Sequence, residues 1–171
     1  MNEPNKSLLS AGLALLLGAW AIQALGDSPD DFVDEASAKG IAEIETGKMA
    51  LEKSTSPEIK RFAEQMIKDH TQANQELADL AKRKNLEVAT EAELMNKAKA
   101  MILELRSGES FDEAYTNNQV EAHEATIELF REQSEDAEDP DIKAFATSTL
   151  PKLEQHLEMA KRLADTHKMM D

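Results

Sequence analysis

The sequence predicts an all-α protein: an up-down four-helix bundle made of two repeated αα-hairpins, with a short connecting helix between them. From Asp30 onward, apolar residues recur with a helical period and without the alternation of strands. Two pairs typical of helix starts, Ser56-Pro57 and Asp139-Pro140, divide this region. The motif Pro57-Glu58-Ile59-Lys60-x-Phe62-Ala63 returns as Pro140-Asp141-Ile142-Lys143-x-Phe145-Ala146. The repeat indicates two copies of one helical hairpin. Each copy has a stripe of apolar residues along its helices and needs the other copy to cover that stripe.

The first hairpin is expected to contain helices over residues 30–54 and 57–84. The second of these helices ends in Lys82-Arg83-Lys84, whose positive charges suit the negative end of a helix dipole. Asn85 follows directly and is one of the few residues that readily adopts the left-handed conformation of a helix C-cap.

A short connecting helix is expected over residues 91–106, and the second hairpin over 111–136 and 140–168. Thr90-x-x-Glu93 and Ser110-x-x-Glu113 have the spacing of capping boxes, which place helix starts beside them.

The N-terminal segment 1–26 differs from the rest of the chain and resembles a signal peptide. Lys6 precedes an apolar run over residues 8–25. Small residues near the end of this segment offer cleavage points after Ala21 or after Gly26. The run is also long enough for an N-terminal membrane anchor, which stays the alternative. Either interpretation predicts an extracytoplasmic location, in the periplasm or cell envelope, for the bundle domain over residues 27–171.

The composition excludes several function classes. The chain has 34 acidic and 19 basic residues, a net charge of −15, and no cysteine. Nucleic-acid binding is not expected, because its affinity rests on basic residues that neutralise phosphates. An anionic membrane surface would repel the chain as well, so membrane contact is expected only through the N-terminal segment, if that segment is retained. Thiolate metal sites and cysteine nucleophiles are excluded, and the four histidines are the only imidazole ligands.

Four ionisable residues lie on the apolar faces of the long predicted helices. At 100° per residue, Glu43 falls within the apolar stripe of the first helix, between Gly40 and Gly47. The other three helices carry one histidine each on the corresponding face: His70, His123 and His156. A polar group there is costly unless it is paired or coordinated.

These four residues are expected at one level of the bundle. Glu43 and His70 lie about 18 and 21 Å from their hairpin loop, at 1.5 Å per residue, and His123 and His156 about 22 and 25 Å from theirs. Three imidazoles and one carboxylate suit one divalent transition-metal ion, with zinc, iron, manganese and copper all admissible.

A structural interpretation explains the same pattern without metal. Glu43 could pair with a protonated His70 or His156 and form a buried polar network that only specifies packing. Both interpretations stay open at this point. His167 lies in the last predicted turn and is read as a residue that compensates the helix dipole, not as a ligand.

An ordered series of motifs runs over nearly the whole exported part. These are Phe32-Val33, Gly40-Ile41-Ala42-Glu43-Ile44-Glu45-x-Gly47, Phe62-Ala63-x-x-Met66-x-x-Asp69-His70, Phe111-Asp112-x-Ala114-Tyr115, His123-Glu124, Asp139-Pro140-Asp141-Ile142-Lys143-x-Phe145-Ala146 and Thr149-Leu150-Pro151-x-Leu153-x-x-His156. In these motifs the chain resembles the bacterial domain-of-unknown-function family 4142, whose members are exported proteins. The resemblance implies a ferritin-like bundle outside the cytoplasm and no established activity.

The residues argue against the di-iron centre that a ferritin-like fold suggests. Such centres use Glu-x-x-His on two helices, and here Ile67 and Leu153 stand three residues before His70 and His156. A di-iron enzyme is therefore disfavoured, and one ion in a histidine-rich site is expected instead.

The expected function is that of an exported envelope protein that binds one transition-metal ion, for metal handling or envelope stress. The alternative from another class is a structural or interaction domain with a buried Glu/His network and no metal. A metal-dependent redox enzyme is less favoured, and no residue is assigned a catalytic role.

Overall fold

The computed structural model describes residues 28–92 and 94–168, and its secondary structure there is entirely helical. The all-α prediction is thereby confirmed. The helices, in chain order, are α1 (Pro29–Lys53), α2 (Pro57–Lys84), α3 (Leu94–Glu104), α4 (Gly108–Asp136) and α5 (Pro140–Lys168). The predicted segment 1–26 lies outside the described residues, and so does Glu93 of the first proposed capping box.

Most helix ends follow from local chemistry. Ser56 caps α2 by accepting a hydrogen bond from the backbone N–H of Ile59. Asn85 ends α2 in the left-handed conformation, with φ 57°. Asp139 accepts hydrogen bonds from the first backbone N–H groups of α5.

The predicted capping box at Ser110 is wrong. The helix α4 begins at Gly108, so Ser110 lies within its first turn. The preceding residue, Ser107, is the N-cap but makes no side-chain capping bond. Gly108 has a φ of 56°, and a residue without Cβ adopts this value at little cost. The chain therefore turns into α4 three residues after the end of α3, and the N-cap lies three residues before the predicted one.

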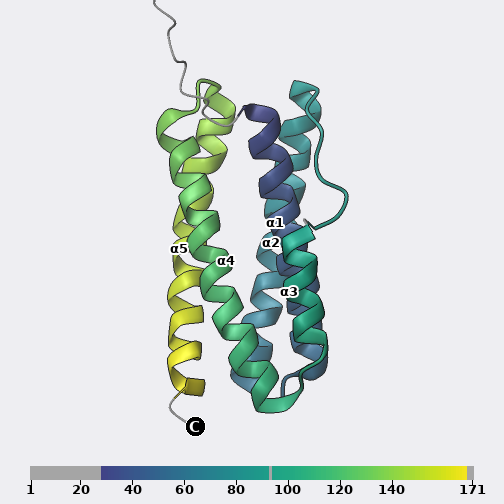
Figure 1. The fold of residues 1–171 in the computed structure, drawn as a ribbon. Helices are drawn as coiled ribbons and strands as arrows, with labels where there is room; N and C mark the ends of the chain where they lie inside the picture. The colour runs from purple at the N-terminus through teal and green to yellow at the C-terminus, as the bar shows by residue number, and fades with distance from the viewer. Residues whose placement is uncertain (1–27, 93, 169–171) are drawn as a thin grey trace, which may run out of the picture.

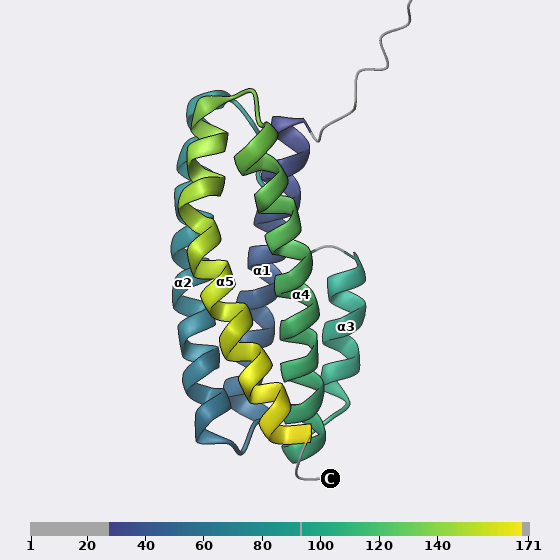
Figure 2. The same ribbon diagram turned by 90° about the vertical axis from the view of Figure 1, so that its left-hand side faces the viewer.

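The two hairpins have their loops at opposite ends of the bundle (Figure 1). After α2, residues 85–92 and α3 run back along the outside, and α4 starts at the end where α2 started. The helix α3 lies against α1 and α4. In the four-helix core, α1 contacts α2 and α4, and α5 contacts α2 and α4 (Figure 2). Every neighbouring pair in this square is antiparallel, as an up-down bundle requires.

The apolar core consists of two clusters. One contains Phe32, Val33, Leu77, Phe130, Ile142 and Phe145, and the other contains Ile59, Phe62, Met66, Phe111 and Tyr115. The repeated motifs supply matching members of both clusters, such as Ile59 and Ile142, each fully buried. Buried polar residues, among them Glu43, His70, Gln119, His123 and His156, come from the middle of the long helices.

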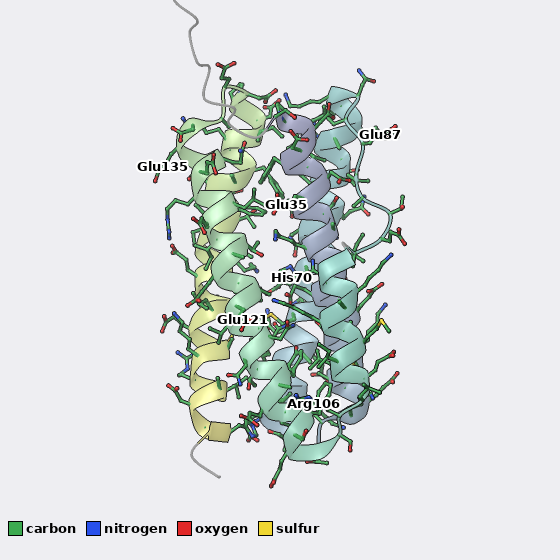
Figure 3. All side chains as sticks on the ribbon, viewed as in Figure 1. Glu35, His70, Glu87, Arg106, Glu121 and Glu135 are labelled. Carbon is green, nitrogen blue, oxygen red and sulfur yellow. The ribbon has the colours of Figure 1, made fainter. Side chains whose placement is uncertain are left out.

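Most acidic residues lie on the outer surface. Figure 3 shows Glu87 and Glu135 at the periphery of the bundle and His70 between the helices. Among the described helices, none has a stretch apolar and long enough to cross a membrane.

Candidate metal centre

Three histidines from three helices meet in the middle of the bundle. Counted from the helix starts, His70 is residue 14 of 28 in α2, His123 is residue 16 of 29 in α4, and His156 is residue 17 of 29 in α5. Because each lies near mid-length, they reach one level although the two hairpins point in opposite directions.

The three imidazoles form an almost equilateral triangle. The distance between ring centroids is 5.6 Å for His70 and His123, 5.4 Å for His70 and His156, and 5.5 Å for His123 and His156. One nitrogen of each ring lies within 4.8 Å of the others. Zinc–imidazole bonds of about 2.0–2.1 Å bring ligand nitrogens to within roughly 3.5 Å of one another. Closing the triangle on an ion therefore requires side-chain shifts of about 1 Å.

In two of the three rings, a hydrogen bond determines which nitrogen carries the hydrogen and which has a free lone pair. The His123 Nδ1 lies 2.9 Å from the Gln119 backbone oxygen, and the His156 Nε2 lies 2.9 Å from Asp69 Oδ2. Both oxygens act as acceptors, so these nitrogens carry the hydrogen. The lone pairs are then on His123 Nε2 and His156 Nδ1. These two atoms and His70 Nε2 are buried and have no hydrogen-bond partner among the described residues.

The surroundings keep His70 and His156 neutral. Burial lowers the pKa of His70 well below its ordinary value, and the neighbouring His123 and His156 act in the same direction. Burial also lowers the pKa of His156 to about 4, although its hydrogen bond to Asp69 opposes the shift. Because a metal binds only the neutral imidazole, His70 and His156 are ready to bind at neutral pH without losing protons.

Glu43, the fourth residue that the sequence proposed, lies beside this group. Its Oε2 accepts a hydrogen bond of 2.6 Å from the Gln119 side chain. Burial raises the pKa of its carboxyl, and the nearby His123 acts in the opposite direction. The carboxylate is not among the ligand atoms that lie within 4.8 Å of one another in the described part of the chain. The structure thus brings the three histidines together, and direct ligation by Glu43 stays a prediction.

Asp69 also belongs to this site, which the sequence analysis did not predict. Burial disfavours its charged form, yet hydrogen bonds from Gln65, His156 and Lys152 hold its pKa below the ordinary value. A carboxylate that accepts the second N–H of a metal-binding histidine orients the ring and raises its basicity. Only two weak features of the sequence indicate this role of Asp69. It lies at the edge of the apolar face of α2, and Lys152, one of its partners, is one turn before His156.

The apo protein should lose stability as the pH falls below about 6.5, the ordinary pKa of histidine. A lowered pKa in the folded state means that the unfolded chain binds the proton first. The loss for His156 begins near pH 6.5 and levels off near its folded pKa of about 4, reaching about 3 kcal/mol. The raised pKa of Glu43 opposes the loss, because its protonation favours the folded state.

Urea unfolding of chelator-treated protein at pH 7.5 and 4.5 measures this effect. The variant His156→Gln removes the titrating group and should show a smaller loss. An equal loss in both proteins would contradict the account.

The sequence was also compared with known proteins. The family described as a domain of unknown function, DUF4142, matches residues 18–163. The chain belongs to this family. The match confirms the resemblance seen in the motifs. No curated protein matches the DUF4142 chain.

Two solved structures share the fold of this DUF4142 member. One is CopM in the Cu(II)-bound form, with a TM-score of 0.68 and 15% identity, over 80% of this chain and 95% of that chain. The other is a conserved hypothetical protein, Rv2844, from Mycobacterium tuberculosis, with a TM-score of 0.60 and 15% identity, over 78% of this chain and 88% of that chain. At this identity the likeness shows a common helical fold.

Proposed function

We propose that this DUF4142 protein is an exported envelope protein that binds one transition-metal ion in its core, for metal handling or envelope stress. The ligands are His70 Nε2, His123 Nε2 and His156 Nδ1. Export is supported by the basic start, apolar run and small residues of segment 1–26.

The observation that carries the proposal is the state of these three nitrogens. Each is buried without a partner among the described residues, and all three come from rings in one triangle. A buried polar atom that lacks a partner costs about 1–3 kcal/mol, so three of them at one point need an explanation. A metal ion would satisfy all three at once.

The donor set favours some ions over others. Three neutral imidazoles suit copper and zinc, whereas manganese prefers carboxylate and water oxygens. CopM, which has a similar fold, has been solved in a Cu(II)-bound form. Copper(II) is therefore the first ion to test, with zinc(II) beside it.

The second candidate function is a structural or interaction domain with a metal-free polar network. Two hydrogen bonds favour it, because Gln119 satisfies Glu43 and Asp69 satisfies His156 without any ion. The same network leaves these three nitrogens buried without partners in the described residues. A network that only specified packing would be expected to pair them.

Metal content decides between the two functions. We expect untagged mature protein, exposed to copper(II) or zinc(II) and dialysed, to retain about one ion per chain by elemental analysis, because coordinated ions bind tightly. The variant His70→Ala should retain less than about a tenth of an ion.

The matched control is His167→Ala, which removes a histidine of the last turn of α5 outside the triangle. It should load like the wild type. Less than about a tenth of an ion in the wild type, unchanged in His70→Ala, would refute metal binding.

A further inference from the structure

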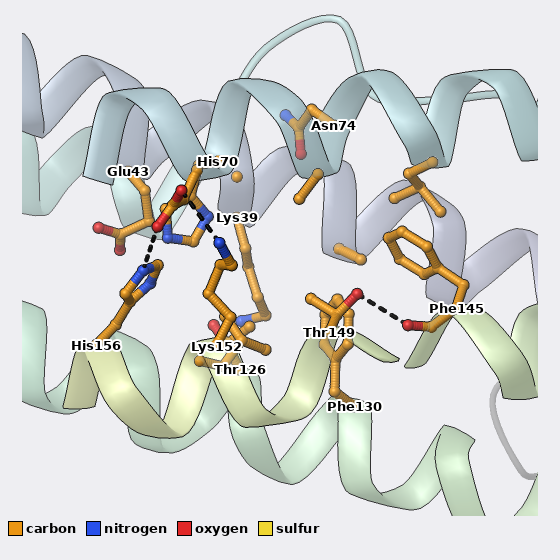
Figure 4. A pocket seen from close by; sticks show the side chains of 16 residues that line it. Lys39, Glu43, His70, Asn74, Thr126, Phe130, Phe145, Thr149, Lys152 and His156 are labelled. Carbon is orange, nitrogen blue, oxygen red and sulfur yellow. Dashed lines mark hydrogen bonds and ion pairs between the residues drawn. The ribbon is translucent and has the colours of Figure 1, made fainter. Parts of the chain in front are cut away.

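A cavity adjoins the histidine triangle on one side (Figure 4). All four long helices line it, and its wall includes His70 and His156 as well as Glu43 and Asp69. The space open to the centres of water molecules is about 30 Å³. Because one water needs about 10–15 Å³ by this measure, the cavity has room for about two waters or one ligand of two or three atoms.

The cavity extends from the histidines towards the surface. Phe130, Phe145 and Leu77 form its apolar part, and the half-buried Ala73, Asn74 and Thr149 also line it. Lys152 lines it too, and its side chain is 51% exposed. The same cavity is therefore lined both by the two histidines and by side chains that reach solvent.

A divalent ion bound by three neutral imidazoles favours an anion as a further ligand, because its own ligands leave its charge uncompensated. The cavity wall carries charges of both signs, Lys39 and Lys152 against Glu43 and Asp69. The side chain of Lys39 is 18% exposed and lies 3.2 Å from Glu35, and that of Lys152 lies 3.3 Å from Asp69.

The two acidic side chains of the wall already have partners. Asp69 accepts hydrogen bonds from His156, Lys152 and Gln65, and Glu43 accepts one from Gln119. Neither carboxylate needs the ion to satisfy it. Metal sites with three histidines commonly keep a fourth position for water or another exogenous ligand.

We propose that this cavity is a binding site for a small anion, which takes the open coordination position of the ion held by His70, His123 and His156. The ligand class is a monoanion of two or three heavy atoms, the size of azide. This proposal rests on the proposed metal binding. It assigns the fourth coordination position, predicted from the sequence for Glu43, to an exogenous ligand.

The test uses full-length mature protein loaded with copper(II), its metal content measured first. Titration with sodium azide should give a saturable azide-to-copper charge-transfer absorption. The variant Ala73→Leu fills the cavity and should abolish the absorption at unchanged copper content. Thr149→Leu fills it from α5 and serves if Ala73→Leu does not fold. Ala125→Leu, at an exposed position of α4, is the matched control and should bind azide like the wild type.

Lys39→Met tests the charge of the wall and should weaken azide binding about fivefold. Lys48→Met removes an exposed lysine of the same helix outside the cavity and should leave the affinity unchanged.

The outcomes separate the two proposals. Copper-loaded protein without an azide absorption would overturn the anion site and leave metal binding intact. Gain of the absorption only in Glu43→Gln would assign the fourth position to Glu43 and equally overturn the anion site. Azide binding that survives in both Ala73→Leu and Thr149→Leu would place the anion elsewhere. Protein that takes up no metal would overturn both proposals.

Discussion

We expect the metal-loaded protein to unfold about 6–12 °C above the apo protein at a free-ion concentration one hundred times the dissociation constant. Binding only to the folded state adds about 3 kcal/mol under these conditions. For a domain of this size, each kcal/mol corresponds to about 2–4 °C. Differential scanning calorimetry with and without a chelator measures the shift.

The position of the ligands explains why the ion should stabilise the whole bundle. His70 belongs to the hairpin α1–α2, whereas His123 and His156 belong to the hairpin α4–α5. An ion bound to all three links the hairpins between the two apolar clusters. Unfolding would have to release the ion, since the isolated hairpins do not hold the complete ligand set.

The control for this prediction is His70→Leu. It should abolish the metal-dependent shift, while its apo form should be at least as stable as the wild-type apo protein. Leucine removes the unpartnered buried Nε2, and replacing such a group by an apolar one is nearly neutral or stabilising. Equal unfolding temperatures of the wild type with and without chelator would support the metal-free interaction domain instead.

The second large effect is expected from Phe32→Ala, which should cost about 3–5 kcal/mol of unfolding free energy. Phe32 in α1 is fully buried, with its ring 5.2 Å from that of Phe130 in α4 and 6.5 Å from that of Phe145 in α5, both edge-to-face. The side chain thus joins one hairpin to the other. Urea unfolding of the apo protein measures the loss.

Leu105→Ala is the matched control for this truncation. Leu105 follows α3 and is 90% exposed, so its removal should change stability by less than about 0.5 kcal/mol. Phe32 lies outside the histidine triangle, so the variant should still bind one ion per chain while it remains folded. A loss below about 1 kcal/mol would show that the two hairpins are held together by other contacts.

The fold was largely predictable because its signals are local. The starts of α2 and α5 follow from Ser56-Pro57 and Asp139-Pro140, and both helices have their predicted bounds. The helix start at Ser110 was predicted wrongly because the capping-box motif was considered without the turn at Gly108. That turn starts α4 earlier.

The candidate site was predictable in part. Helical periodicity placed His70, His123 and His156 on apolar faces. Because each lies near the middle of its helix, the three come to the same level whichever way each hairpin points. Two features were not accessible in this way. The bond between Asp69 and His156 joins residues 87 positions apart, and that between Gln119 and Glu43 spans 76 positions. Such pairings depend on how two helices rotate against each other.

The sequence alone determined that the protein is a bundle of two related hairpins, because periodicity, caps and the repeat are each written in neighbouring residues. It also determined which imidazoles face the core. Only the tertiary structure decided that three of them meet in one triangle, which nitrogens stay free, and that Glu43 turns to Gln119. Those outcomes depend on packing between helices distant in the chain, where shifts of about 1 Å distinguish a ligand from a neighbour.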